Sequence, residues 1–272
     1  MSESHKKKYH EPSLNVEDLT SSLYSATQKL NQTIRERDEI FANISHDLRS
    51  PITAIHNSIE YLQSLDHITE SDIRSALPLL SERTLTLENM INNIFLLTKL
   101  DSAESLMKFE TIPAVAFLED FYYSRENDTK YIDRHLTFNV PENLHGCIYI
   151  DPVYMQRVLD NLFENALKFT DKGDQITLSA APLKKGNRLN KAVMHITVEN
   201  TGKAIAPSDL PYIFNRTYMS SESRTPGSHS GAGLGLSICN SIIQKHNGII
   251  WCESDPAIKK GCSFHIELPL AH

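Results

Sequence analysis

One histidine stands among side chains that suit phosphoryl chemistry. His46 opens the six-residue run His-Asp-Leu-Arg-Ser-Pro, in which Asp47 is its neighbour and Pro51 closes the run. A neutral imidazole is a competent nucleophile near neutral pH, because its unperturbed pKa is about 6.5. An adjacent carboxylate can hold the Nδ1 proton and so keep Nε2 as the nucleophile. The run therefore predicts phosphoryl transfer to His46.

A second group of polar residues suits a metal ion and phosphates. Asn161 and Asn165 stand four residues apart, and Lys168 follows three residues later. On a helix these spacings place the three side chains on one face. An amide oxygen is a hard ligand for magnesium, and an ammonium neutralises phosphate charge. The alternative interpretation of this face is an ordinary solvated helix surface.

A glycine-rich run follows further along the chain. Gly231, Gly233 and Gly235 alternate with Ala232, Leu234 and Leu236 just before a predicted helix. Backbone N–H groups at such a helix start can cradle phosphates without obstruction by side chains. A glycine run alone is weak evidence. Its position after the histidine and asparagine motifs indicates a nucleotide-binding module.

Helical periodicity in the first hundred residues predicts the element that carries His46. Apolar positions recur in steps of three and four from Val16 to Ile44, as in a coiled-coil seam, and the pattern continues to Leu62. Residues 66–72 supply a turn and an N-cap for a second helix that extends to about Leu97. Pairing with a second copy into a four-helix bundle would bury both apolar stripes. The alternative is a hairpin that packs on its own C-terminal domain.

The remainder of the chain alternates strand and helix patterns. Predicted strands cover residues 136–140, 147–150, 175–180, 192–199, 248–253 and 263–268, and predicted helices cover 113–128, 152–169 and 233–246. This order predicts an α/β sandwich with helices on one face of a mixed sheet. Residues 184–191 and 220–230 are predicted loops, the second a candidate lid over a nucleotide.

Composition limits the classes of function. The 272 residues carry a formal net charge of -7, which argues against a nucleic-acid partner. The four cysteines lack the spacing of a zinc or redox motif, so we expect free thiols in a reducing compartment. No apolar run reaches the roughly 18 to 20 residues that a membrane helix needs. The expected location is cytoplasmic, with membrane attachment only through a possible upstream sensor.

Taken together, the motifs resemble the catalytic core of a bacterial two-component sensor histidine kinase, over residues of about 30 to 270. The resemblance implies an α+β protein, in which a long helical hairpin, dimeric as a four-helix bundle, precedes an α/β sandwich ATP-binding domain of the GHKL or Bergerat type. It divides the chain into an N-terminal tail and coiled-coil linker (1–35), a dimerisation and histidine phosphotransfer domain (36–104) and a catalytic ATP-binding domain (105–272).

The resemblance also implies roles for the histidine motif. His46 would be the phosphorylated residue and Asp47 its acidic partner. Ser50 stands where related kinases with phosphatase activity usually carry threonine or asparagine, so it is a candidate for positioning water in dephosphorylation of a partner.

By the same resemblance, ATP and Mg²⁺ are the expected cofactors. Asn165 would be the Mg²⁺ ligand, Lys168 would neutralise phosphate and Phe169 would lie near the adenine. Clamp-type ATPases of the same fold place a glutamate general base where this chain has Asn161. Because an amide cannot take a proton, transfer to histidine is favoured over hydrolysis.

Two motifs depart from the family pattern. Asn200 and Gly202 match the box that reads the adenine amino group, but Asn200 replaces an aspartate and Ala204 replaces the second glycine. An uncharged acceptor is weaker than a carboxylate. In the next box, Thr217 and Met219 replace a phenylalanine and an arginine, and the expected positive charge toward the γ-phosphate falls to Arg216 or Arg224.

The resulting hypothesis is a homodimeric kinase that phosphorylates itself on His46 with Mg-ATP and passes the phosphoryl group to an aspartate in the receiver domain of a response regulator. The alternative, motivated by the departures above, is a catalytically impaired pseudokinase that acts as a dimeric scaffold. A hydrolytic ATPase is disfavoured by Asn161 and by the intact histidine motif.

Overall fold

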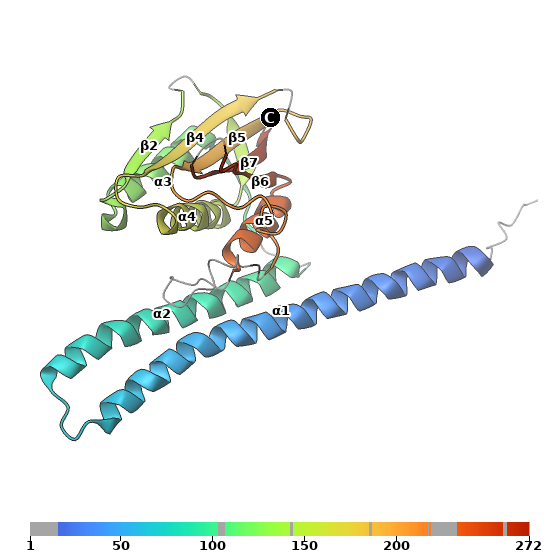
Figure 1. Ribbon diagram of the computed structural model, residues 1–272. Helices are drawn as coiled ribbons and strands as arrows, with labels where there is room; N and C mark the ends of the chain where they lie inside the picture. The colour runs from blue at the N-terminus through green and yellow to red at the C-terminus, as the bar shows by residue number, and fades with distance from the viewer. Residues whose placement is uncertain are drawn as a thin grey trace, which may run out of the picture. The chain divides into compact units, whose positions relative to one another are not determined.

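The computed structural model describes residues 16–102, 107–141, 144–184, 187–216, 218, 233–257 and 260–271. The chain divides into two compact units, residues 1–46 and 47–272, which we describe separately. Helix α1 (Val16–Ser64) begins in the first unit and ends in the second (Figure 1).

The described part of the first unit is the N-terminal portion of α1. Apolar side chains on the predicted seam, including Leu19, Leu23 and Leu30, are exposed in the single chain. A solvent-exposed apolar stripe on a helix of this length is what a coiled-coil partner would cover.

The second unit begins with the remainder of α1, which continues through Pro51 to Ser64. Helix α2 (Glu70–Asp101) follows after a short loop. Thr69 is its N-cap: the hydroxyl accepts from the backbone N–H of Asp72, whose carboxylate accepts from the backbone N–H of Thr69 at 2.9 Å. This reciprocal capping box confirms the predicted start of the second helix.

Apolar residues of α2 fall into two environments. Met90, Leu96, Leu97 and Leu100 are buried in the core that the C-terminal domain shares. Large apolar side chains nearer the hairpin loop, among them Leu77, remain exposed. The C-terminal end of α2 therefore packs on its own chain, whereas the rest of the apolar stripe is available to a second copy.

The C-terminal domain is built on a seven-stranded sheet with the order β1-β3-β7-β5-β4-β2, and β6 also pairs with β7. All strand pairs are antiparallel except β2 with β4. The strands are β1 (Glu110–Pro113), β2 (His135–Asn139), β3 (Cys147–Ile150), β4 (Gln175–Leu183), β5 (Val193–Asn200), β6 (Ile249–Glu253) and β7 (Cys262–Ala271).

Three helices, α3 (Ala114–Glu126), α4 (Pro152–Lys168) and α5 (Gly235–Lys245), lie along one face of this sheet (Figure 1). A short 3₁₀ helix, η1 (Thr129–Tyr131), follows α3. Alternate residues of β5, such as Ile196 and Val198, are buried, as expected for a sheet covered on one face. Leu159, Leu162 and Phe163 of α4 are buried in the same core.

The structure confirms the predicted fold class and the predicted strands, with ends shifted by a few residues at most. Strand β1 was not predicted. Its burial pattern carries no alternation, and among the described strands it pairs with β3 alone. Residues 184 and 187–191 lie in the predicted loop between β4 and β5, whereas the predicted lid, 220–230, lies outside the described residues.

Two expectations about the whole chain can also be compared with the structure. All four cysteines are free thiols. Among the described residues, no helix combines the length and the apolar character needed to cross a bilayer.

Candidate functional site

Helix α4 presents the predicted asparagine pair on a half-buried face. Asp151 caps the helix, because its Oδ1 accepts from the backbone N–H groups of Val153 and Tyr154 at 3.0 and 3.2 Å. The opposite side of α4 is buried in the core. Asn161 and Asn165 are both intermediate in exposure, so their amides lie at the boundary between core and solvent.

The amide of Asn161 lies between α4 and α5. Its Nδ2 is buried and makes no hydrogen bond of good geometry among the described residues. The thiol of Cys239 on α5 lies beside this amide: burial raises the pKa of the thiol to about 12, and an interaction with the Asn161 side chain partly opposes that rise. Asn161 therefore links α4 to α5 where the glycine run begins the second helix.

The glycine run brings the start of α5 to the same place. A Cβ atom on Gly235 would lie 3.5 Å from Asn161 Oδ1, so the helix start and the asparagine are neighbours. Gly233 has a φ of 63°, a left-handed conformation that favours glycine. The N-cap residue, Leu234, makes no capping bond with its side chain. The first N–H groups of α5 are therefore available to an anion.

Leu234 and Leu236 flank this helix start, the first buried and the second half-buried. Gly231 lies outside the described residues. The side chains of Leu234 and Leu236 contribute to the core rather than to a polar site.

Lys168 and Phe169 end α4 on its exposed side. The Lys168 Nζ lies 5.2 Å from the centroid of the Phe169 ring. Partial burial lowers the pKa of Lys168, although its side chain as a whole is exposed. Phe169 is 37% exposed as a whole residue, so part of its surface is accessible to a ligand.

The loop after β5 packs tightly against the end of α4. A Cβ atom on Gly202 would lie 1.9 Å from the carbonyl oxygen of Phe169, so only glycine fits there. The backbone N–H of Lys203 donates to the same oxygen at 2.8 Å. Asn200 is 2% exposed, and its Oδ1 accepts from the backbone N–H of Gly202 at 3.1 Å. The structure thus places Asn200 and Gly202 beside the end of α4.

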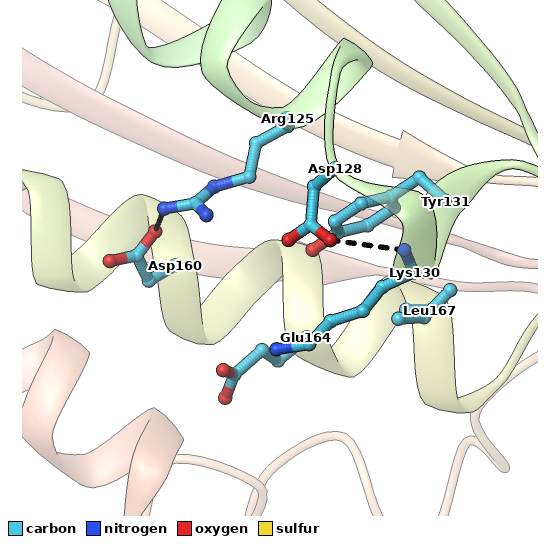
Figure 2. A pocket seen from close by; sticks show the side chains of 7 residues that line it. All are labelled: Arg125, Asp128, Lys130, Tyr131, Asp160, Glu164 and Leu167. Carbon is cyan, nitrogen blue, oxygen red and sulfur yellow. Dashed lines mark hydrogen bonds and ion pairs between the residues drawn. The ribbon is translucent and has the colours of Figure 1, made fainter.

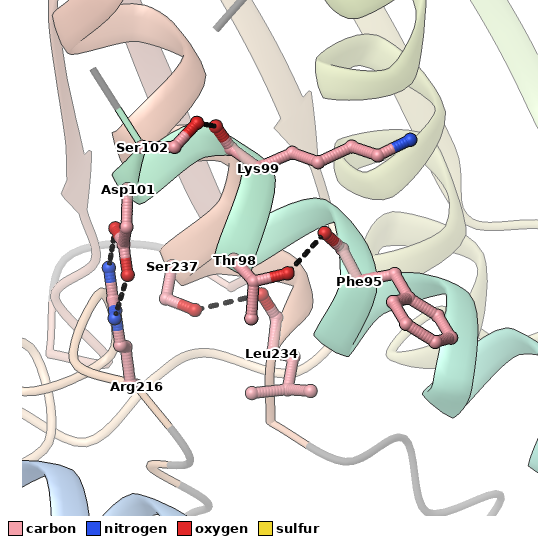
Figure 3. A network of polar contacts seen from close by, with 8 residues as sticks. All are labelled: Phe95, Thr98, Lys99, Asp101, Ser102, Arg216, Leu234 and Ser237. Atoms are coloured by element: carbon pink, nitrogen blue, oxygen red, sulfur yellow. Dashed lines mark hydrogen bonds and ion pairs between the residues drawn. The ribbon is translucent and has the colours of Figure 1, made fainter. Parts of the chain in front are cut away.

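Arg216 forms an ion pair with the end of α2. Its guanidinium forms a two-pronged ion pair with Asp101 at the end of α2, with Nη1 2.7 Å from Oδ2 (Figure 3). Nearby, Arg157 of α4 donates to the Asn93 side chain of α2 at 2.6 Å. Thr217, Met219 and Arg224 lie outside the described residues.

The histidine motif lies on α1. His46 and Ser50 are exposed, and Asp47 is half-buried. Ser50 is one helical turn beyond His46.

A small pocket of about 130 Å³ lies between α3, η1 and α4 and was not predicted (Figure 2). Arg125 forms an ion pair with Asp160 at its edge, and burial raises the pKa of Tyr131 to about 12. Asp160 and Glu164 directly precede the two asparagines but line this other pocket. No group of acidic, histidine or cysteine side chains suited to a metal ion occurs among the described residues.

Sequence reasoning missed two residues that hold predicted ones in place, Asp101 and Cys262. Asp101 binds Arg216, and Cys262 accepts from the Asn200 amide. These contacts join positions 115 and 62 residues apart, so no local pattern reveals them.

Comparison with known proteins gives two family matches in the order that the motifs have along the chain. Residues 36–103 match the His Kinase A (phospho-acceptor) domain. Residues 150–272 match the histidine kinase-, DNA gyrase B- and HSP90-like ATPase. His46 lies in the first match, and the α4, Asn200 and α5 motifs lie in the second.

A curated relative, the sensor protein SrrB of Staphylococcus aureus, is 29% identical over 234 residues. The alignment covers 86% of this chain but only 38% of SrrB, so the chain spans well under half of that relative.

Solved structures show the same fold. Histidine kinase ThkA, in a complex with response regulator protein TrrA, matches with a TM-score of 0.67 and 22% identity, over 91% of this chain and 66% of ThkA. Acinetobacter baumannii histidine kinase AdeS matches with a TM-score of 0.61 and 17% identity, over 84% of this chain and 98% of AdeS. With a phospho-acceptor match followed by an ATPase match and a sensor-protein relative, the chain belongs to the sensor histidine kinases.

Proposed function

We propose that this chain phosphorylates itself on His46 with Mg-ATP and then passes the phosphoryl group to an aspartate in the receiver domain of a response regulator. The observation that carries the proposal is that Asn161 of α4 lies beside the glycine start of α5, with its Oδ1 3.5 Å from the position of a Cβ atom on Gly235. A polar helix face with an adjacent helix N-terminus suits a phosphate-bearing ligand.

The residues present fit ATP and Mg²⁺. Asn165 would supply an amide oxygen to the metal ion, because it lies half-buried on α4 one helical turn after Asn161. Lys168 would face phosphate oxygens, and Phe169 would offer its ring to the base. When bound, Mg²⁺ neutralises phosphate charge and makes the γ-phosphorus more susceptible to attack.

His46 would act as the nucleophile. Its Nε2 lone pair forms the new bond to phosphorus while the bond from that phosphorus to the departing ADP oxygen breaks. Asp47, half-buried next to it, would hold the proton on Nδ1 and so fix the reactive tautomer. Asn161 would orient the nucleotide without activating water, because a carboxamide takes no proton near neutral pH. Transfer to histidine is then favoured over hydrolysis.

The partners follow from the same arrangement. ThkA was solved with a response regulator, which supports a receiver domain as the acceptor for this chain. The exposed apolar residues of α1 and α2 support a homodimer through the hairpin. The proposed domain boundaries are at 35/36 and 104/105, and the His Kinase A match over residues 36–103 supports them. A membrane-bound sensor segment outside this sequence is consistent with the partial coverage of SrrB.

Ser50 would position water when the partner is dephosphorylated. The Ser50→Ala variant should therefore dephosphorylate the partner more slowly, without a reduction of the label on His46.

The test is incubation with γ-labelled ATP and Mg²⁺. Wild type should acquire an acid-labile, alkali-stable label, and His46→Gln and Asn165→Ala should acquire none. His56→Gln is the matched control, because His56 is an exposed histidine of the same helix, 3.5 Å from Glu60. It should be labelled like wild type.

Two other outcomes would contradict the proposal. Phosphate release without a phosphoprotein would indicate a hydrolytic ATPase. An unlabelled wild type that still binds ATP would indicate an impaired scaffold.

A further inference from the structure

The side-chain amide of Asn200 is held at both of its ends. Its Oδ1 accepts from the backbone N–H of Gly202 at 3.1 Å. Its Nδ2 donates to Sγ of Cys262, the first residue of β7, at 3.3 Å. Asn200 is 2% exposed and Cys262 is 4% exposed, so water does not readily replace either contact. Together the two contacts set the orientation of the amide group, with Oδ1 toward Gly202 and Nδ2 toward Cys262.

Orientation matters for an amide in a way that it does not for a carboxylate. Both oxygens of an aspartate accept hydrogen bonds, so a rotation of the carboxylate by half a turn changes nothing. An asparagine turned the same way exchanges an acceptor for a donor. This chain has asparagine at a position where the resembling family has aspartate, and so it needs a means of fixing the amide.

Two glycines pack closely around Asn200. A Cβ atom on Gly261 would lie 1.8 Å from the Asn200 carbonyl oxygen and 3.0 Å from Oδ1. On the other side, Gly202 is packed against Phe169 and Thr170 at the end of α4. The oxygen end therefore lies toward the loop that meets the candidate nucleotide face, and the nitrogen end lies toward β7.

We propose that Cys262 is a positioning residue for nucleobase specificity: it accepts from Nδ2 and so keeps the oxygen of Asn200 as the group presented to the base. The inference rests on the proposed function and on the family resemblance, by which Asn200 matches the position that reads the adenine amino group. An acceptor at this point matches the amino group of adenine, whereas a donor matches the carbonyl oxygen of guanine.

The energetic argument concerns two orientations. In the observed orientation both Gly202 N–H and Asn200 Nδ2 have acceptors. In the reversed orientation the amide nitrogen would face the Gly202 N–H, donor against donor. Without an acceptor at residue 262, the observed orientation leaves Nδ2 buried and unpaired, which costs free energy as well. The two orientations then become closer in free energy, and a fraction of the molecules offers a donor to the base.

The experiment measures the dissociation constants of non-hydrolysable ATP and GTP analogues by calorimetry on the whole chain. Cys262→Val, nearly isosteric but without an acceptor, should lower the preference for ATP over GTP by about tenfold. Cys262→Ser, which keeps an acceptor, should stay within about twofold of wild type. Circular dichroism checks folding, and Cys262→Ala replaces the valine variant if that variant does not fold.

The Asn200→Asp variant tests whether the effect of Cys262 depends on an amide at residue 200. A carboxylate has no donor end, so Cys262→Val in Asn200→Asp should leave the ATP to GTP ratio unchanged within about twofold, even if both affinities fall. An unchanged ratio for Cys262→Val alone, or an equal loss of ratio in the aspartate background, would overturn the inference. A wild type that binds neither analogue would instead overturn the proposed function.

Discussion

At the scale of single residues, the structure shows how buried polar groups are matched one by one. His246, which follows α5, is 3% exposed. Its Nδ1 lies 2.8 Å from the Ile242 carbonyl oxygen, which only accepts, so Nδ1 carries the proton. Nε2 then accepts from the backbone N–H of Asp151 at 2.9 Å. The neutral imidazole thereby connects the end of α5 to the cap of α4.

This arrangement predicts a pH dependence of stability. Burial lowers the pKa of His246 in the folded chain below its ordinary value of 6.5. The unfolded chain then binds the proton more readily, so the free energy of unfolding falls as pH drops from 6.5 toward the lower folded pKa. Urea unfolding from about pH 8 to about pH 5 should show this fall.

His246→Gln should be less stable at neutral pH but show a shallower fall in acid. Burial also lowers the pKa of His195, so part of the slope should remain. His56→Gln, a change at an exposed histidine, should leave the profile unchanged. A profile for His246→Gln as steep as that of wild type would contradict the assignment.

At the scale of elements, the ion pair of Arg216 with Asp101 joins the loop that follows β5 to the end of α2 (Figure 3). A guanidinium matches a carboxylate and a phosphate with the same fork of donors. If Arg216 serves the γ-phosphate, Asp101 competes with the nucleotide for it. This ion pair would then determine how readily the C-terminal domain separates from α2.

Asp101→Asn should therefore strengthen binding of an ATP analogue several-fold, and Arg216→Ala should weaken it. The loss of stability should be at most about 1 kcal/mol, because both side chains are partly exposed. Glu70→Gln is the matched control: it breaks the exposed pair with Arg74 on the same helix, at 2.6 Å, and should change neither quantity. Unchanged nucleotide affinity in Asp101→Asn would contradict the competition.

The elements also show what the sequence could and could not predict. Helices α1 and α2 follow from apolar steps of three and four and from the cap at Thr69, since these signals are local. The Asn161 and Asn165 spacing predicted one helix face for the same reason. Strand β1 was not predicted, because its four residues at the sheet edge show no alternation of buried and exposed side chains.

Contacts that depend on topology were beyond prediction. Asn200 meets Cys262 only because β5 and β7 pair in a register that sets these two residues opposite each other. Asp101 meets Arg216 only because the end of α2 lies beside the loop that follows β5. Neither pairing leaves a periodic or compositional trace in the sequence, so the residues that orient the predicted site could be found only in the folded chain.

At the scale of the whole molecule, exposed apolar residues of the hairpin favour pairing with a second copy of the chain. Leu77 and Ile91 belong to the predicted stripe of α2, and their side chains are 58% and 40% exposed. Burial of one such side chain contributes roughly 1.5 to 3 kcal/mol. A four-helix bundle formed by two hairpins would bury both copies of each residue.

Leu77→Asp and Ile91→Asp should each weaken the homodimer at least about tenfold, as measured by sedimentation equilibrium. Val153→Asp is the matched control, because Val153 is 75% exposed on α4, outside the hairpin. That variant should remain dimeric. A monomeric wild type, or an equal effect of Val153→Asp, would contradict dimerisation through this stripe.

The central claim is that His46 accepts the phosphoryl group from ATP held at the α4 face. The most direct measurement is ³¹P NMR with peptide mass spectrometry of the whole chain after reaction with Mg-ATP. We predict one phosphohistidine, on Nε2 of His46, which is absent from Asn165→Ala. Phosphate on another residue, or consumption of ATP with His46 unmodified, would contradict the account.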